Sequence, residues 1–134
     1  MAARVKTIKQ RVVVPAPPGT VYKAFVTPKL HAAFTNSPAT GSGRVGGKFT
    51  AWDGYISGVN RELEPGKRIV QSWRTTEWPP GAVDSELDLM FTAVKGGTEI
   101  RMVHSNVPAG QADSYKQGWI DCYWTPLKKY FTQG

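Results

Sequence analysis

The sequence predicts an α+β domain in which a curved antiparallel sheet of about six strands wraps around a long C-terminal helix. Strand-like segments are grouped together and do not alternate with helices, which is typical of α+β domains with an antiparallel sheet. Residues 118–131 then read as one amphipathic helix, with apolar residues four apart on one stripe: Trp119, Tyr123, Leu127 and Phe131. That stripe needs a large apolar surface, and only the preceding sheet offers one, which favours a pocket between sheet and helix.

The first strand and two short helices follow from alternation and from the prolines. Ile8, Gln10, Val12 and Val14 alternate with Lys9, Arg11 and Val13, the period-two pattern of a half-buried strand. Residues 15–18 end this strand, and because proline is tolerated in the first helical turn, residues 21–26 are predicted to form a helix. Pro28 ends that helix and residues 29–34 form a second one. Residues 36–47, rich in glycine and serine, are predicted to be a loop.

The next turn is predicted at Asp53-Gly54, because a type I′ turn needs positive φ at both central residues. A two-residue turn there pairs Ala51 with Ile56 and lets the ring of Phe49 cover Gly58. A second turn over residues 64–67 is interpreted as a three-residue loop, which pairs Leu63 with Ile69 and Val59 with Trp73.

A third hairpin turn is predicted at Gly96-Gly97, which pairs Ala93 with Ile100, Phe91 with Met102, and Leu89 with His104. One face of this hairpin is then apolar except at His104. The opposite face carries solvated residues in cross-strand positions: Asp84, Glu86, Asp88, Glu99, Arg101 and Ser105.

Composition fits one domain, residues 1–134, without disulfides or metal. The single Cys122 has no partner and no Cys/His cluster has zinc spacing, so we expect a reducing compartment, a cytoplasmic location, and neither metal nor cofactor. No signal peptide, membrane anchor or membrane span is expected. The net charge of +7 is spread, with no run of five basic residues, so nucleic acid is not an expected partner.

Two interpretations apply to the aromatic set Trp52, Tyr55, Trp73, Phe91, Trp119 and Tyr123. These rings fill the core, or some of them line a cavity of about 300 to 1,000 Å³ that admits an apolar ligand, because one helix cannot fill a strongly curved sheet. The predicted ligand pocket consists of Trp73, Phe91, Met102, His104, Trp119 and Tyr123.

His104 has a structural and a functional interpretation. In the core it donates one ring proton to a hydroxyl or carbonyl and stays neutral, since a buried charge without a partner is costly. Functionally, it binds a polar ligand head or acts as a general base. Base catalysis needs an orienting acid, and the nearby carboxylates point to the opposite face by parity. No catalytic triad or carboxylate pair is found in the sequence, so no catalytic residue is assigned.

Other motifs favour structural roles. The glycine-rich residues 41–47 lack the Gly-Lys-Ser/Thr ending of a phosphate loop and precede a strand, so we interpret them as a flexible loop. His31 is expected to be a surface residue. Cys122 is expected to be a small buried apolar residue, because it has no basic neighbour in sequence.

The predicted partner-binding residues are Trp78, Arg74, Lys67 and Arg68. Trp78 precedes Pro79, Pro80 and Gly81, and a tryptophan in a proline-stiffened loop loses little entropy on binding. The alternative is that Trp78 folds back to close the end of the sheet. Arg74 would pair with an acidic partner or with an outward carboxylate such as Glu62.

Several motifs together resemble the homologues of the C-terminal domain of the activator of the ninety-kilodalton heat-shock chaperone ATPase: VPAP (14–17), FTNSPA (34–39), VGGKF (45–49), WDGYISG (52–58), LEPGKRIVQSWR (63–74), GW (118–119) and YW (123–124). That family belongs to the helix-grip superfamily of the steroidogenic lipid-transfer domains and the birch-pollen allergen. The resemblance covers nearly the whole chain and implies a curved antiparallel sheet around a long C-terminal helix.

The resemblance also implies a partner. In the full-length co-chaperone this domain is similar to the part that contacts the chaperone's nucleotide-binding domains, while a separate N-terminal domain, which we expect to be absent here, docks on the middle domain. The leading hypothesis is therefore a non-enzymatic co-chaperone-like module that contacts a heat shock protein 90-type chaperone through a basic face and the Trp78 loop. The second is a binder of a small hydrophobic molecule, and the third an enzyme that uses His104.

Overall fold

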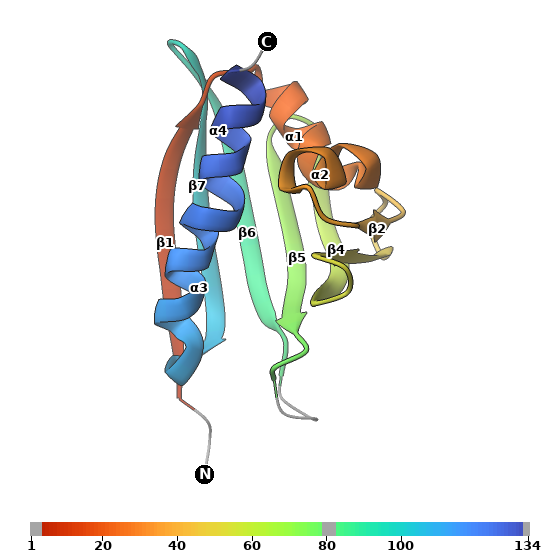
Figure 1. The fold of residues 1–134 in the computed structure, drawn as a ribbon, viewed down its shortest axis with the longest axis vertical. Helices are drawn as coiled ribbons and strands as arrows, with labels where there is room; N and C mark the ends of the chain where they lie inside the picture. Colours follow the sequence, from red (N-terminus) through yellow and green to blue (C-terminus); the bar gives the residue numbers. More distant parts are fainter. Residues whose placement is uncertain (1–3, 79–82, 133–134) are drawn as a thin grey trace.

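A computed structural model describes residues 4–78 and 83–132 as a seven-stranded antiparallel sheet that curves around a C-terminal helix (Figure 1). The strand order is β1-β7-β6-β5-β4-β3-β2. The strands are β1 Val5–Val14, β2 Thr40–Gly41, β3 Lys48–Ala51, β4 Ile56–Glu64, β5 Arg68–Thr75, β6 Ser85–Val94 and β7 Gly97–Pro108. The helices are α1 Pro18–Val26, α2 Pro28–Thr35, the 3-10 turn η1 Ala109–Gln111, α3 Ala112–Trp119, the π-helical turn η2 Ile120–Trp124 and α4 Thr125–Thr132. The predicted α+β helix-grip class is confirmed.

The N-terminal elements follow the prediction closely. Ile8, Val12 and Val14 of β1 are buried, and both α1 and α2 begin with a proline in the first turn. α2 ends at Thr35 and is followed by Asn36, whose left-handed φ of 59° is common just after a helix C-terminus. Part of the segment predicted as a loop forms the short strand β2, which pairs with β3. The sheet therefore has seven strands instead of about six, because two residues of backbone pairing leave no periodic signal in the sequence.

The β3–β4 turn confirms its predicted register. Ala51 pairs with Ile56 and Phe49 with Gly58, while Asp53 and Gly54 have the positive φ values that the turn requires. At Gly58 an added Cβ would lie 1.8 Å from the Ser72 carbonyl oxygen and 2.7 Å from the Phe49 ring. Only glycine fits where two strands and this ring approach so closely.

The β4–β5 hairpin confirms one predicted pair and corrects another. Leu63 pairs with Ile69 across a three-residue loop. Further along, the register shifts by one residue between Asn60 and Glu62, so Asn60 pairs with Gln71. A β-bulge places an extra residue in β4. The predicted pairing of Val59 with Trp73 is therefore wrong, and the backbone N–H of Val59 donates to Ser72 Oγ at 2.9 Å.

The β6–β7 hairpin has the predicted faces but a register that differs by two residues. Val94 pairs with Gly97 around a turn at Lys95-Gly96, which corrects the predicted pairs to Phe91 with Ile100, Leu89 with Met102, and Leu87 with His104. Gly97 belongs to the strand, and only glycine fits there because a Cβ would lie 2.0 Å from the Val14 carbonyl oxygen on β1. A shift of two residues preserves the side-chain parity, so His104 still faces the core.

The C-terminal helix starts earlier than predicted and is interrupted by the π turn η2. Proline has no N–H and its ring collides with the carbonyl four residues back, so Pro126 cannot continue a regular α-helix. The chain widens instead, and the N–H of Thr125 bonds to the carbonyl of Ile120, five residues back. The wider turn brings the rings of Trp119 and Trp124 into a stack with centroids 5.4 Å apart.

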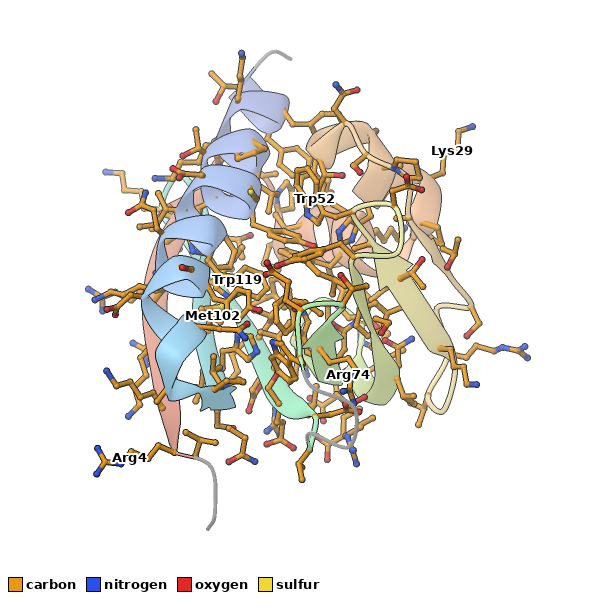
Figure 2. All side chains as sticks on the ribbon, turned by 60° about the horizontal axis from the view of Figure 1, so that its bottom comes forward. Arg4, Lys29, Trp52, Arg74, Met102 and Trp119 are labelled. Atoms are coloured by element: carbon orange, nitrogen blue, oxygen red, sulfur yellow. The ribbon has the colours of Figure 1, made fainter. Side chains whose placement is uncertain are left out.

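The helix stripe packs on the sheet as predicted. Trp119, Tyr123 and Leu127 are buried and Phe131 is half-buried. Figure 2 shows Trp52 and Trp119 pointing into the space between helix and sheet. Among residues 4–78 and 83–132, no helix is long and apolar enough to span a membrane, and no three potential metal ligands gather together.

Candidate ligand cavity

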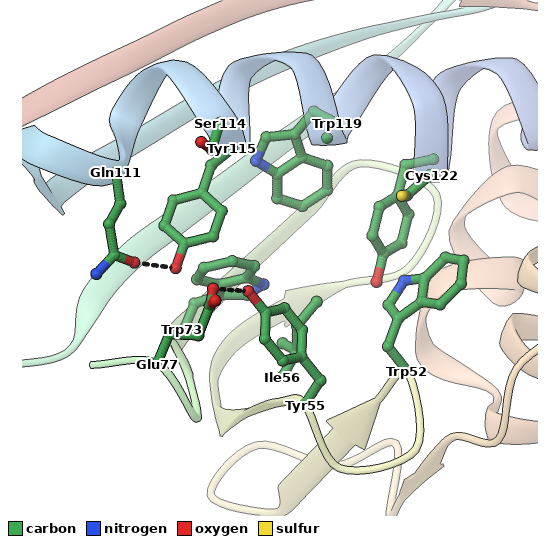
Figure 3. Close-up of a pocket in the computed structure, with 12 residues that line it drawn as sticks. Trp52, Tyr55, Ile56, Trp73, Glu77, Gln111, Ser114, Tyr115, Trp119 and Cys122 are labelled. Atoms are coloured by element: carbon green, nitrogen blue, oxygen red, sulfur yellow. Dashed lines mark hydrogen bonds between the residues drawn. The ribbon is translucent and has the colours of Figure 1, made fainter. Parts of the chain in front are cut away.

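A cavity of about 750 Å³ lies between the C-terminal helix and the β3–β4 turn, partly open to solvent (Figure 3). The helix side of the wall comes from η1, α3 and η2, and the sheet side comes from β4, β5 and the adjoining turns. Twelve residues line it: Trp52, Tyr55, Ile56, Trp73, Glu77, Gln111, Ser114, Tyr115, Gly118, Trp119, Cys122 and Tyr123. Its size is in the range of small-molecule sites.

Backbone irregularities shape both sides of the cavity. On the helix, the π turn directs Trp119, Cys122 and Tyr123 toward the sheet, with the Trp119 and Tyr123 rings 4.7 Å apart. On the sheet, Trp52, Asp53 and Gly54 all have positive φ, at 54°, 56° and 87°. Three consecutive left-handed residues turn the chain so that Trp52 and Tyr55 face the helix (Figure 3).

Aromatic rings line the end of the cavity between Trp52 and Tyr123. Trp52 packs edge-to-face against Tyr123, with centroids 6.4 Å apart. The Trp52 Nε1 atom is buried and has no hydrogen-bond partner among the described residues. Burial raises the pKa of the Tyr123 hydroxyl, which therefore stays neutral. Burial also raises the pKa of the Cys122 thiol, with a smaller contribution from the nearby charge of Asp121.

A polar cluster lies at the other end of the cavity. The Tyr55 hydroxyl donates to the Glu77 carboxylate, and the Tyr115 hydroxyl donates to Gln111 Oε1 (Figure 3). Burial, and secondly the Glu77 carboxylate, raise the pKa of Tyr55. Tyr115 also accepts a hydrogen bond from the indole N–H of Trp78 at 2.8 Å. These bonds fix the positions of the polar groups before any ligand enters.

The cavity includes only half of the predicted pocket residues. Trp73, Trp119 and Tyr123 line it, whereas Phe91, Met102 and His104 do not. Phe91 is away from the cavity because its ring packs under α1, against Tyr22 and Phe25. Met102 and His104 are fully buried in the sheet face below the helix.

The sequence prediction missed the N-terminal part of the helix wall. The predicted helix began at Gly118, but the four-residue spacing of the stripe continues backward from Trp119 to Tyr115 and Gln111, both of which line the cavity. Extending that stripe would have found them. No comparable signal indicates Glu77, which follows β5 in a turn.

His104 has its structural role and is not available as a base. Trp119 Nε1–H donates to His104 Nδ1 at 3.1 Å, so the ring proton is on Nε2, which donates to Ser85 Oγ at 2.8 Å. The Ser85 hydroxyl in turn donates to the Trp73 carbonyl at 2.6 Å. Burial lowers the pKa of His104 to about 3. The ring is neutral, with both nitrogens occupied and no carboxylate bonded to it in the described part of the chain.

His31 corrects the prediction of a surface histidine. It lies on α2 and is buried against α1 and η2, where its ring contacts Phe25 and Tyr123. Its Nδ1 bonds the Phe25 carbonyl at 3.1 Å and its Nε2 bonds the Tyr123 hydroxyl at 2.9 Å. The carbonyl only accepts, so Nδ1 carries the proton and Nε2 accepts from Tyr123. Burial lowers the pKa of His31. This histidine therefore links α2 to the helix wall of the cavity.

The four predicted partner-binding residues do not form one surface. Trp78 is 5% exposed and bonded to Tyr115, so the prediction of an exposed Trp78 contact is wrong, and the alternative of an inward-folded ring holds. Residues 79–82, including Pro79, Pro80 and Gly81, lie outside the described residues. Arg74 bonds Asp84 at 2.8 Å and lies over the Trp78 ring.

The other two predicted partner residues lie at the opposite end of β5. Arg68 forms a two-bond ion pair with Asp88 and a second pair with Glu62 at 3.2 Å. Lys67 is exposed, and no ion pair of it is found within residues 4–78 and 83–132. At about 3.3 Å per strand residue, the Cα atoms of Arg68 and Arg74 are roughly 20 Å apart along β5.

Comparison with known families identifies the chain. The family described as "Activator of Hsp90 ATPase homolog 1-like protein" matches residues 15–132. The activator of 90 kDa heat shock protein ATPase homolog 1 of Homo sapiens is 38% identical over 117 residues, which are 87% of this chain and 34% of that protein. The homologue of Dictyostelium discoideum is 35% identical over 115 residues, 85% of this chain and 30% of that protein. The chain thus spans about a third of the length of these relatives.

Solved structures show the same fold at lower identity. An HSP90 activator from Plasmodium falciparum superimposes with a TM-score of 0.84 at 24% identity, covering 96% of both chains. The allergen Ara h 8.0201 superimposes with a TM-score of 0.76 at 13% identity, covering 98% of this chain and 100% of the other. The shared fold is a helix-grip fold, and the family match over residues 15–132 shows that the chain belongs to the family of activator of Hsp90 ATPase homolog 1-like proteins.

Proposed function

We propose that this chain is a cytoplasmic co-chaperone-like module that binds an Hsp90-type chaperone and modulates its ATPase without catalysing a reaction itself. The observation that carries the proposal is the 38% identity to the human activator over 117 residues. That identity spans most of this chain and about one third of the relative, so the proposal concerns what this one domain contributes.

The charge of the chain supports contact with an acidic surface. No Asp or Glu precedes Asp53, while eight Lys and Arg do, so residues 1–52 carry +8 and residues 53–134 carry −1, with nine basic and ten acidic residues. Uncompensated positive charge steers association with acidic partners.

Three of the basic residues of the chain lie near the middle of β4. The Asn60 side chain donates to the Arg44 carbonyl, Lys48 pairs with Val59, and Arg61 follows Asn60. We call Arg44, Lys48 and Arg61 the β3-edge cluster. All three are exposed, and the described residues include no ion pair of theirs. We propose this cluster as the contact surface, in place of Trp78.

The test is titration into a purified Hsp90-type chaperone at low and high salt, together with its steady-state ATPase rate. We expect binding that weakens with salt, because exposed charges are screened. The triple variant Arg44→Glu, Lys48→Glu and Arg61→Glu should bind at least tenfold more weakly. The matched control carries Lys95→Glu, Lys128→Glu and Lys129→Glu, on the β6–β7 turn and α4, and should bind as the wild type does. Absence of binding at low salt would refute the proposal, and equal losses in both variants would refute the β3-edge surface.

The cavity favours a second candidate function, the binding of a small hydrophobic molecule. Its volume of about 750 Å³ is not filled by side chains, and six of its twelve lining residues are aromatic. An unfilled apolar space of this size costs packing energy that a ligand would restore.

Gly118 offers a direct test of ligand binding. A Cβ at Gly118 meets nothing within 4 Å, so Gly118→Leu would place a side chain in the cavity and improve helix propensity. We expect wild-type protein to bind the neutral fluorescent probe N-phenyl-1-naphthylamine, and Gly118→Leu to lose that binding. Gln117→Leu, on the exposed side of the same helix, is the control and should bind normally. Equal binding by both variants would show that the probe sits elsewhere.

A further inference from the structure

We propose that the cavity is selective for an organic monocation, an amine or quaternary ammonium joined to an apolar body, over neutral and anionic ligands. This inference rests on the second candidate function, the binding of a small molecule between sheet and helix. Three features of the cavity carry it: the sign of its charge, the aromatic rings around that charge, and the separation of its polar and apolar ends.

The charge of the cavity is opposite to that of the chain. The chain carries +7, with 17 Lys and Arg, yet Glu77 is the only charged residue among the twelve that line the cavity. An anionic head, such as the carboxylate of a fatty acid, would find no cation there and would be repelled by Glu77. A cation would gain a partner in a site partly shielded from water.

The Glu77 carboxylate is held in place beside aromatic rings. The Tyr55 hydroxyl donates to its Oε2 atom, while Oε1 has no partner within the described ranges, so one oxygen is fixed and one is available. Trp73 and Tyr115 meet edge-to-face nearby, with centroids 5.4 Å apart, and both rings line the cavity (Figure 3). A carboxylate beside aromatic rings is an environment that favours organic cations, through ion pairing and cation–π attraction.

The two ends of the cavity set the direction of the ligand. Glu77 is exposed and marks the open end, whereas Trp52, Trp119 and Tyr123 enclose the apolar end. The charged head therefore stays at the mouth, where it remains partly hydrated, and the apolar body goes inward. No full desolvation of the ion is needed, which lowers the cost of binding a charge.

The test uses three probes of similar size: benzyltrimethylammonium, its neutral carbon isostere neopentylbenzene, and the anion 3-phenylpropanoate. Each is titrated into ¹⁵N-labelled protein while the indole N–H signals of Trp52, Trp73 and Trp119 are followed. We expect the cation to bind about tenfold more tightly than the neutral isostere, as a partly desolvated cation–π and ion-pair site allows, and the anion to bind most weakly.

The charge of Glu77 is tested with Glu77→Gln, which retains an acceptor for the Tyr55 hydroxyl and should bring the affinity of the cation close to that of the neutral isostere. Glu86→Gln removes an exposed carboxylate outside the cavity and should keep the tenfold preference. If the three probes bind equally, or the preference survives in Glu77→Gln, cation selectivity is refuted while ligand binding stands. If no probe shifts the indole signals, both are refuted.

Discussion

Acidification should destabilise this protein through His104. The folded state holds the imidazole neutral, with its pKa lowered from 6.5 to about 3 by burial, whereas the unfolded chain protonates it near 6.5. Between these two pKa values the unfolded state binds more protons than the folded state. The free energy of unfolding therefore has its full value above about pH 7 and decreases as the pH falls. At roughly 1.4 kcal/mol per pH unit, His104 alone should remove about 2 kcal/mol between pH 7.5 and pH 5.

The matched variant is His104→Gln. Glutamine can accept from Trp119 and donate to Ser85, the two bonds that the imidazole makes, but it does not titrate near neutral pH. We expect the variant to be less stable than the wild type at pH 7.5 because the amide fits the site less well. Between pH 7.5 and pH 5, however, the variant should lose about 2 kcal/mol less free energy of unfolding than the wild type loses.

The measurement is urea unfolding followed by tryptophan fluorescence at pH 7.5, 6 and 5 for both proteins. Burial also lowers the pKa of His31. Its contribution to the pH dependence of stability is the same in the wild type and the variant, so it cancels when the two proteins are compared. The reasoning is refuted if wild type and His104→Gln lose the same free energy between pH 7.5 and pH 5, or if NMR titration finds the His104 ring protonating near pH 6.

Three further substitutions test the packing around the cavity. Gly58→Ala should destabilise the protein by about 2 to 3 kcal/mol in urea unfolding, since its Cβ would overlap the Ser72 carbonyl oxygen; a neutral effect would contradict the close approach. Trp78→Ala should cost about 3 to 5 kcal/mol and lower the melting temperature, because the ring is core; an unchanged melting temperature would support the exposed placement. Tyr123→Phe should cost about 1 to 3 kcal/mol by leaving buried His31 without its hydroxyl donor, and a stability equal to that of the wild type would argue against that bond.

The fold was predictable because its main determinants are local. Alternation in β1, prolines in the first turns of α1 and α2, and the Asp53-Gly54 turn each indicate their element without reference to the rest of the chain. The side-chain parity of β6 and β7 was also predictable, because a period of two survives a two-residue shift in register.

The errors occur where a distant segment decides the local structure. The β6–β7 turn lies at Lys95-Gly96, which leaves Gly97 in the strand and against the backbone of Val14 on β1. His31 is buried because η2, nearly a hundred residues later, covers it. Trp78 folds inward because Tyr115 offers its hydroxyl. None of these contacts is visible to a pattern read within a window of sequence, so the composition of a loop or short helix gives a poor estimate of its exposure.

The cavity follows from local exceptions to regular structure. A regular α-helix through residues 119–124 would separate Trp119 and Trp124 by about 140° around the axis, whereas the π turn at Ile120–Trp124 stacks them and leaves Tyr123 and Cys122 facing the sheet. The cause is one residue, Pro126, which cannot donate within the helix. On the sheet side of the cavity, the three left-handed residues of the β3–β4 turn direct the rings of Trp52 and Tyr55 toward the helix. A regular helix and an extended backbone at Trp52 would redirect these rings. The departures from regular structure in both walls therefore shape the cavity.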